Sequence, residues 1–166
     1  ATRQESQDIC FIPDGDYVSY IKKRSDREFP KGNFVDMDNN VLGTHNGIIN
    51  YTVGQRKGLG ISLGKPMYVA SKNPIDNTVV LVDDSDLFSK TLKIKDINLI
   101  ACDSIKEPTK LHAKIRYRHN AAIATVIQTD DNTIEVEFDE PQRAIAKGQS
   151  CVLYDGDIVV GGGIIC

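Results

Sequence analysis

Long apolar runs and closely spaced cysteines are both missing from this 166-residue sequence. No apolar run approaches the roughly 20 residues that a membrane-spanning helix needs, and the N-terminus lacks the charged-then-apolar pattern of a secretory signal. Four cysteines, at positions 10, 102, 151 and 166, form no CxxC pair, which argues against a zinc site or a disulfide framework. We therefore expect a cytoplasmic protein whose cysteines are thiols.

An excess of positive charge is missing as well. The net charge is −3 and the isoelectric point is about 5.6, which excludes a uniformly basic nucleic-acid binder but allows a local basic face. Hydrophobic residues make up 40% of the sequence and charged residues 26%, as in soluble globular proteins. The length suits one ordinary domain or two small ones, with room for a real core.

Glycine is concentrated in residues 43–68 (GTHNGIINYTVGQRKGLGISLGKPMY). This stretch is too short to hold a core of its own, and so much backbone freedom indicates a shaped surface. Arg56 and Lys57, between Gly54 and Gly58, place two cations on a turn that could approach a phosphate backbone. The alternative is a glycine-rich connection between two β modules, with solvated charges at its tip.

The first 65 residues predict an arm and a small β module. Residues 1–15 form the arm, and Asp16 is a candidate N-cap for a short helix over residues 17–23. Residues 33–37 and 41–44 flank an Asp-Asn-Asn turn and predict a hairpin. The apolar run 48–53 is ambiguous between strand and helix, and we favour helix.

From residue 66 onward the pattern is that of short strands separated by Asn, Asp, Pro and Gly turns. This spacing predicts an antiparallel barrel or sandwich over residues 66–166, after a central module over residues 16–65. The fold class is therefore mainly β, with one short helix near the N-terminus. The eight expected strands are residues 67–71, 79–82, 93–101, 112–118, 122–129, 133–138, 151–154 and 158–160.

Two of these strands have charged faces. Alternation in residues 112–118 places Lys114, Arg116 and Arg118 on one side. In residues 133–138 it places Glu135 and Glu137 opposite an apolar face. The two charged rows either face one another across the sheet or leave a cationic strip for nucleic-acid phosphates. Near the end, an Asp-Gly turn precedes three glycines at 161–163, which predict a close approach of strands where a barrel shuts.

Few residues offer catalytic chemistry. Cys10 lies in an extended apolar run away from the β pattern, whereas Cys102 and Cys151 are expected in the core and Cys166 is terminal. His45 is a possible base, although a lone histidine beside glycines is more often a hydrogen-bonded structural residue. No paired carboxylates, Ser-His-Asp order or metal-ligand cluster is visible, so the residues alone do not favour an enzyme.

Several short motifs occur together in a fixed order. They are SQDICFI (6–12), GTHNG (43–47), YTVGQRKGLGI (51–61), KIRYR (114–118), EPQ (140–142), GQ (148–149), YDGD (154–157) and GGG (161–163). With them the chain resembles the C-terminal part of bacterial tRNA-specific 2-thiouridylases, over nearly its whole length. That family transfers sulfur to C2 of the wobble uridine of tRNA.

The resemblance implies that different domains activate the base and carry the sulfur. An N-terminal domain with a Ser-Gly-Gly-x-Asp-Ser loop, absent from this sequence, adenylates the base with ATP, and no cofactor is expected in the present chain. Cys10 matches the cysteine that receives sulfur as a persulfide from a donor protein, and a second cysteine that can pair with it belongs to the other domain. Arg116, Tyr117 and Gln149 match tRNA-contacting positions, to which we add Arg56 and Lys57.

The implied architecture is a small central β module followed by a β-barrel like those of translation factors, in agreement with the strand pattern. By this resemblance the present chain would carry the persulfide cysteine and part of the tRNA surface, and would be inactive alone. Two alternatives remain open. One is a non-catalytic RNA-binding β-barrel in which Cys10 is incidental, and the other is a protein-interaction module that docks through the glycine-rich stretch.

Overall fold

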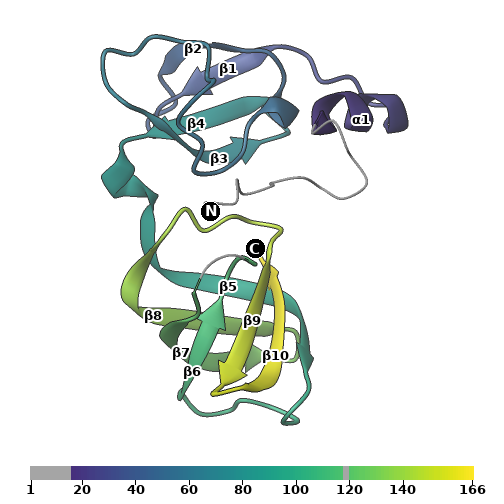
Figure 1. Cartoon of the computed structure of the whole chain (residues 1–166), viewed down its shortest axis with the longest axis vertical. Coiled ribbons are helices and arrows are strands. Elements are labelled where there is room, and N and C mark those ends of the chain that lie inside the picture. Colours follow the sequence, from purple (N-terminus) through teal and green to yellow (C-terminus); the bar gives the residue numbers. More distant parts are fainter. Residues whose placement is uncertain (1–15, 118–119) are drawn as a thin grey trace, which may run out of the picture.

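In a computed structural model, which describes residues 16–117 and 120–166, the chain forms a four-stranded sheet and a closed six-stranded barrel. The sheet lies above the barrel along the long axis of the molecule in Figure 1. The expectation of a mainly β chain with one short helix near its start and an antiparallel barrel is thus confirmed. The strand pairing shows where the two units divide.

The N-terminal elements follow the sequence pattern closely. Helix α1 (Tyr17–Arg24) begins after Asp16, whose Oδ1 accepts a hydrogen bond of 3.0 Å from the Ser19 amide. This bond lowers the pKa of the Asp16 carboxyl, as expected for an N-cap. Strands β1 (Gly32–Val35) and β2 (Val41–His45) form the predicted antiparallel hairpin. The Asp36 carboxylate closes its turn by accepting from the amides of Asp38 and Asn40.

Strands β3 (Tyr68–Asn73) and β4 (Thr78–Val82) complete this sheet in the order β2-β1-β4-β3. The placement of strands 67–71 and 79–82 in the barrel, and of the boundary after residue 65, is therefore corrected: the sheet continues to Val82. The reason is the parallel pairing of β1 with β4, which joins residues 33–35 to residues 78–80. Such a long-range partner leaves no mark on the local strand pattern.

The core of the sheet forms around Phe34, which is fully buried. Its ring lies 5.5 Å from that of His45 and 5.0 Å from that of Tyr51, in edge-on contacts. Residues 48–53, expected as helix, contain only the 3-10 turn η1 (Ile48–Asn50). Tyr51 then leaves this turn extended and fills the core instead.

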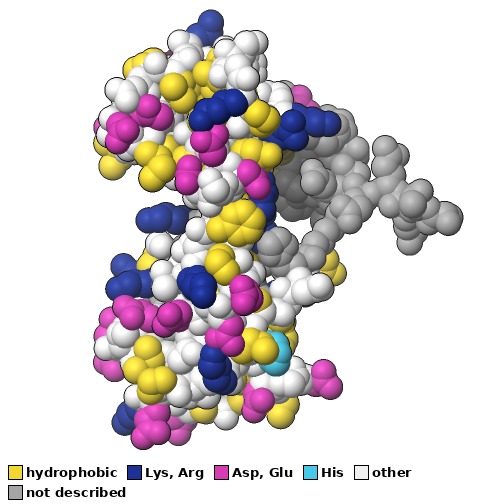
Figure 2. Space-filling view, turned by 90° about the vertical axis from the view of Figure 1, so that its left-hand side faces the viewer, with side chains coloured by type: hydrophobic (Ala, Val, Ile, Leu, Met, Phe, Trp, Pro, Cys, Tyr) yellow, Lys and Arg dark blue, Asp and Glu magenta, His cyan; other side chains and the backbone are white. Residues whose placement is uncertain are grey.

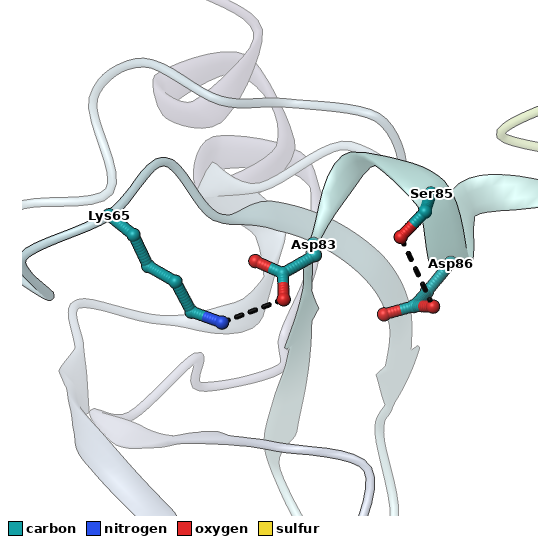
Figure 3. A network of polar contacts seen from close by, with 4 residues as sticks. All are labelled: Lys65, Asp83, Ser85 and Asp86. Carbon is teal, nitrogen blue, oxygen red and sulfur yellow. Dashed lines mark hydrogen bonds and ion pairs between the residues drawn. The ribbon is translucent and has the colours of Figure 1, made fainter.

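A short link carries the chain from sheet to barrel. After β4 it forms the 3-10 turn η2 (Asp84–Leu87) and enters β5 (Phe88–Leu99). Figure 3 shows the polar contacts of this link: Lys65 Nζ lies 2.7 Å from Asp83 Oδ2, and the Ser85 hydroxyl is 3.5 Å from Asp86. The Lys65–Asp83 pair therefore joins the end of the glycine-rich stretch to the end of β4.

The barrel contains β5 and five further strands, all antiparallel, in the closed order β10-β5-β8-β7-β6-β9. Ile134, Val136 and Phe138 point into its core, as the alternation predicts. The five are β6 (Thr109–Lys114), β7 (Ala122–Asp130), β8 (Thr133–Arg143), β9 (Ser150–Asp155) and β10 (Ile158–Ile165).

The three consecutive glycines lie where β10 closes the barrel against β5 and β9. A Cβ at Gly161 would lie 2.5 Å from the Asn98 carbonyl oxygen, and one at Gly162 would lie 2.4 Å from that of Cys151. Real side chains do not approach backbone so closely. The prediction that these glycines permit a close approach of strands is confirmed.

Sheet and barrel meet in a small apolar cluster of their own. Val82, Leu87 and Ala144 are buried there, and Val53, Tyr68, Ala70 and Val80 pack against them. Leu87 also accepts a backbone hydrogen bond of 2.8 Å from the Ala144 amide. The link after β4 is therefore packed against the end of β8.

Candidate functional site

The predicted sulfur-carrying residue, Cys10, lies outside the described residues, as does the whole predicted arm 1–15. The cysteines that the structure describes are free thiols with different surroundings. Cys151 is fully buried, and burial raises its pKa to about 12, so it stays protonated and unreactive at neutral pH. Cys102 is exposed, not in the core as expected, because it follows the end of β5.

His45 is a structural residue. It is fully buried, its Nδ1 accepts a hydrogen bond of 3.1 Å from the Gly47 amide, and its Nε2 lies 3.0 Å from the Asn77 carbonyl oxygen. The first bond fixes the proton of the neutral ring on Nε2, which donates to Asn77. Burial lowers the pKa of the imidazole. The ring therefore ties the β2 end to the turn before β4 and has no access to a substrate.

The predicted row of three cations is only partly present. Strand β6 ends at Lys114, so alternation stops there and the Tyr117 side chain is 92% exposed instead of facing the core. Lys114 Nζ lies 5.8 Å from the centre of the Tyr117 ring, and Arg118 is outside the described residues. The alternative, in which the row faces the glutamates of β8, is wrong because β6 lies between β7 and β9. Glu135 pairs instead with Lys93 at 2.7 Å.

Arg116 turns toward the sheet–barrel junction. Its Nη2 donates a hydrogen bond to the Ala144 carbonyl oxygen, and its Nε is buried without a hydrogen-bond partner in the described part of the chain. Burial, and then the positive charge of Arg143, lower the pKa of the guanidinium. Two arginines thus share one small region of the junction.

Arg143 crosses from the barrel to the sheet. Its Nη2 lies 2.8 Å from Asp84 Oδ1, and its guanidinium stacks over the Tyr68 ring at 5.1 Å. The glycine-rich stretch arrives on the other side: a Cβ on Gly54 would lie 3.2 Å from Ala144 Cβ and 3.6 Å from Arg143 Nη1. Gly54 has φ +88° and its amide donates to the Val69 carbonyl oxygen, so β3 holds the stretch in place.

The other candidate residues follow from these contacts. Arg56 and Lys57 are exposed just beyond Gly54, on a turn held by the Gln55 side chain, which accepts from the Thr52 amide and donates to the Lys57 carbonyl. Gln149 is exposed five residues after Ala144, and its carbonyl accepts from the Ile165 amide at 2.8 Å. A hollow of about 350 Å³, lined in part by Leu59, Ile61 and Met67, opens beside Arg56.

We call the segments 53–57, 115–117 and 143–149 the seam, since they meet where sheet and barrel touch. These segments touch through Gly54, Ala144 and Arg116, and they contain the five predicted RNA-contacting residues: Arg56, Lys57, Arg116, Tyr117 and Gln149. Figure 2 shows Lys and Arg side chains around the waist between the two halves of the molecule. Sequence reasoning missed Arg143 and Asp84. The one signal in the sequence was that Arg143 directly follows the EPQ motif.

Two other possibilities find no support in residues 16–117 and 120–166. No group of three His, Cys, Asp or Glu side chains in these ranges is placed to hold a metal ion. None of their helices is long and apolar enough to cross a membrane.

Comparison with protein families divides the chain at the same place as the structure. Residues 19–83 match a tRNA methyl transferase PRC-barrel domain, and residues 89–165 match an aminomethyltransferase beta-barrel domain. The gap between the two matches falls on the link from β4 to β5.

Several curated proteins are similar over almost the whole chain, and each is called tRNA-specific 2-thiouridylase MnmA. The protein of Clostridioides difficile (strain 630) is 55% identical over 163 residues, which are 98% of this chain and 45% of that protein. The protein of Acetivibrio thermocellus is 53% identical over 165 residues, 99% of this chain and 46% of that protein. The chain thus spans less than half the length of these relatives.

Proposed function

Because the chain belongs to the family of tRNA-specific 2-thiouridylases, we propose that it supplies the tRNA-binding surface and the sulfur-carrying cysteine of such an enzyme. The observation that carries the first part is the seam. Loops from the sheet and from the barrel, which carry all the predicted contact residues, meet there through Gly54, Ala144 and Arg116. In this proposal the two folded units present one binding surface.

The chemistry of the seam suits an RNA backbone. Arg56 and Lys57 are solvent-facing cations that attract phosphates regardless of sequence, and Gln149 adds exposed amide groups. Tyr117 is almost fully exposed and offers a ring on which an unstacked base can stack. The net charge of −3 is no obstacle, because what matters is the local arrangement of cations.

Cys10 is the proposed sulfur carrier. In this proposal it receives sulfur as a persulfide from a donor protein in the cytoplasm and delivers it to C2 of the wobble uridine. The buried Cys151 thiol supports this choice indirectly, because a group with its pKa near 12 is a poor carrier. ATP-dependent activation of the base is assigned to a part of the enzyme outside this chain, so the chain alone is inactive. Its own residues bind the tRNA and hold the sulfur.

Binding of a tRNA transcript with uridine at the wobble position, measured at 50 and 200 mM salt, tests the surface. We expect binding that weakens with salt, because phosphate contacts release counterions. Arg56→Gln and Tyr117→Leu should each weaken it several-fold, while Lys106→Gln, on the exposed β5–β6 connection, should not. Absence of binding at 50 mM salt would overturn the proposal and favour a protein-interaction module.

Exchange of Cys10 for serine in the whole enzyme tests the sulfur carrier. We expect thiolation of tRNA to stop while tRNA binding is unchanged, because the hydroxyl cannot hold a transferable sulfur. Cys102→Ser is the matched control, since its thiol is exposed and lies on the β5–β6 connection of the barrel. Full thiolation by the Cys10→Ser enzyme would leave a non-catalytic RNA-binding barrel as the better description.

A further inference from the structure

Of two arginines at the seam, Arg143 is paired with a carboxylate, that of Asp84, and Arg116 is not paired with one in the described part of the chain. Arg143 uses Nε and Nη2 on Asp84 Oδ1, at 3.2 and 2.8 Å. Arg116 bonds through Nη2 to the Ala144 carbonyl, and its buried Nε is without an acceptor in the described residues. Like charges near one another repel, and a buried N–H without an acceptor is costly. An anion bound between the two guanidinium groups would reduce both costs.

We propose that Arg143, together with Arg116, forms an anion site at the seam that takes a backbone phosphodiester of the bound RNA. This inference rests on the proposed tRNA-binding function and adds Arg143, to which neither the sequence motifs nor the similar proteins give a role. Arg143 comes from the last residue of β8 and Arg116 from the loop after β6, so the phosphate would be held where two barrel segments and the sheet meet.

The surroundings of Arg143 prepare it for this role. Its Nη1 faces Gly54, where the missing side chain leaves the nitrogen uncovered at 3.6 Å from the position a Cβ would take. The Tyr68 ring supports the guanidinium plane from β3 at 5.1 Å. The ring contact does not involve Asp84, so the guanidinium keeps its orientation when the carboxylate is displaced. Asp84 occupies the place of the anion until RNA arrives.

A purely structural role for Arg143 makes a different prediction. If Arg143 and Asp84 only clamp sheet to barrel, the loss of either partner disturbs the seam to the same extent. If Arg143 binds phosphate, its loss weakens tRNA binding, whereas the loss of Asp84 leaves tRNA binding unchanged or strengthens it, because Asp84 competes with the phosphate for the guanidinium and repels it. The half-exposed Asp84 and the solvent access of Arg143 make both substitutions tolerable to the fold.

The test compares Arg143→Gln, Asp84→Asn and the control Lys106→Gln for tRNA affinity between 50 and 200 mM salt. We expect Arg143→Gln to lower affinity roughly three- to tenfold at 50 mM and to reduce the salt slope by about 1, as for the loss of one phosphate contact. Asp84→Asn should bind tRNA as tightly as the unchanged chain or several-fold more tightly. Lys106→Gln should leave affinity and slope unchanged.

Two results would overturn the inference while leaving the proposed function intact. One is unchanged affinity and slope in Arg143→Gln beside weakened binding in Arg56→Gln and Tyr117→Leu. The other is equal weakening by Arg143→Gln and Asp84→Asn, which identifies a clamp. Thermal unfolding of each variant accompanies the binding, since a clamp lowers the melting temperature in both. If the unchanged chain binds no tRNA at 50 mM salt, the proposed function and this inference fall together.

Discussion

At the residue scale, one buried imidazole among aromatic rings makes the stability of the sheet depend on pH. His45 is fully buried against Phe34 and Tyr51 and is neutral, with both nitrogens hydrogen-bonded to backbone groups. A proton on Nδ1 would break its bond from the Gly47 amide and place a charge in the core. The lowered pKa expresses this cost.

We expect the free energy of unfolding to fall as the pH drops below about 6.5, the ordinary pKa of histidine. Between that pH and the lowered folded-state pKa, the unfolded chain binds a proton that the folded chain does not, so unfolding is favoured. Above pH 6.5 this contribution is constant. Urea unfolding at intervals between pH 5 and 8 measures the step.

His45→Gln should remove the step, although it lowers stability at every pH because it disturbs the core. His112→Gln is the matched control, because His112 is exposed on β6, and it should keep the step. A His45→Gln chain with the same pH profile as the unchanged chain would show that another group is responsible.

In the candidate site, some residues could be predicted from the sequence and others could not. Motif resemblance gave Arg116, Tyr117 and Gln149 as tRNA-contacting positions; in the structure Tyr117 and Gln149 are exposed, and Arg116 bonds to the Ala144 carbonyl. The expected strand alternation beyond Lys114 failed, because the strand ends where Arg116 bonds to Ala144. Arg143 and Asp84 lie 59 positions apart in the sequence, and no local pattern could pair them.

At the scale of elements, the closing strand β10 depends on residues without side chains. Gly161 to Gly163 lie so close to the backbones of β5 and β9 that an added Cβ would overlap carbonyl oxygens at 2.4 to 2.6 Å. The barrel can close here only if these positions carry no side chain. This was predictable from sequence because three glycines in a strand weaken it unless close packing requires them.

Gly162→Ala should destabilise the barrel by about 1 to 3 kcal/mol, the usual cost of forcing extra atoms into a packed region. The control is Gly156→Asn in the β9–β10 turn, where φ is +56° and no atom lies within 4 Å of an added Cβ. Asparagine tolerates that conformation, so the control should lose much less. Chemical denaturation compares the two, and equal losses would contradict the close-approach explanation.

The pairing of elements was the least predictable part of the fold. Eight strands were expected after residue 66, and all eight segments are strands, but β3 and β4 pair with the earlier hairpin. Their apolar alternation is the same whether a strand joins a sheet or a barrel. Long-range contacts decide the matter: β4 pairs with β1, and Val79 and Leu81 are buried in the same core as Phe34.

At the scale of the whole molecule, the two units are joined through a small apolar cluster and the ion pair between Arg143 and Asp84. Val82, Leu87 and Ala144 bury each other at the junction, and Arg143 also reaches Tyr68. Each unit also has a larger core of its own. The junction therefore determines whether sheet and barrel unfold together.

We expect Leu87→Ala to cost about 2 to 5 kcal/mol, through a cavity at the junction, and to uncouple the two units. Hydrogen exchange in low denaturant would then show the amides of β4 and of β8 opening with different free energies, whereas in the unchanged chain they open together. Val126→Ala, inside the barrel core, is the comparison and should weaken β8 without separating it from β4. Equal opening free energies for the amides of β4 and β8 in Leu87→Ala would mean that other contacts couple the two units.

The last strand ends beside the seam, and this offers an optical readout. Gln149 and Ile165 are joined by a backbone hydrogen bond of 2.8 Å, and Cys166 follows with an exposed thiol. In a chain with serine at positions 10 and 102, a fluorescent dye could be attached at this one position, while the protonated Cys151 stays unlabelled. If a nucleic acid binds at Gln149 as proposed, the emission of the dye would change, and binding could be followed from this position.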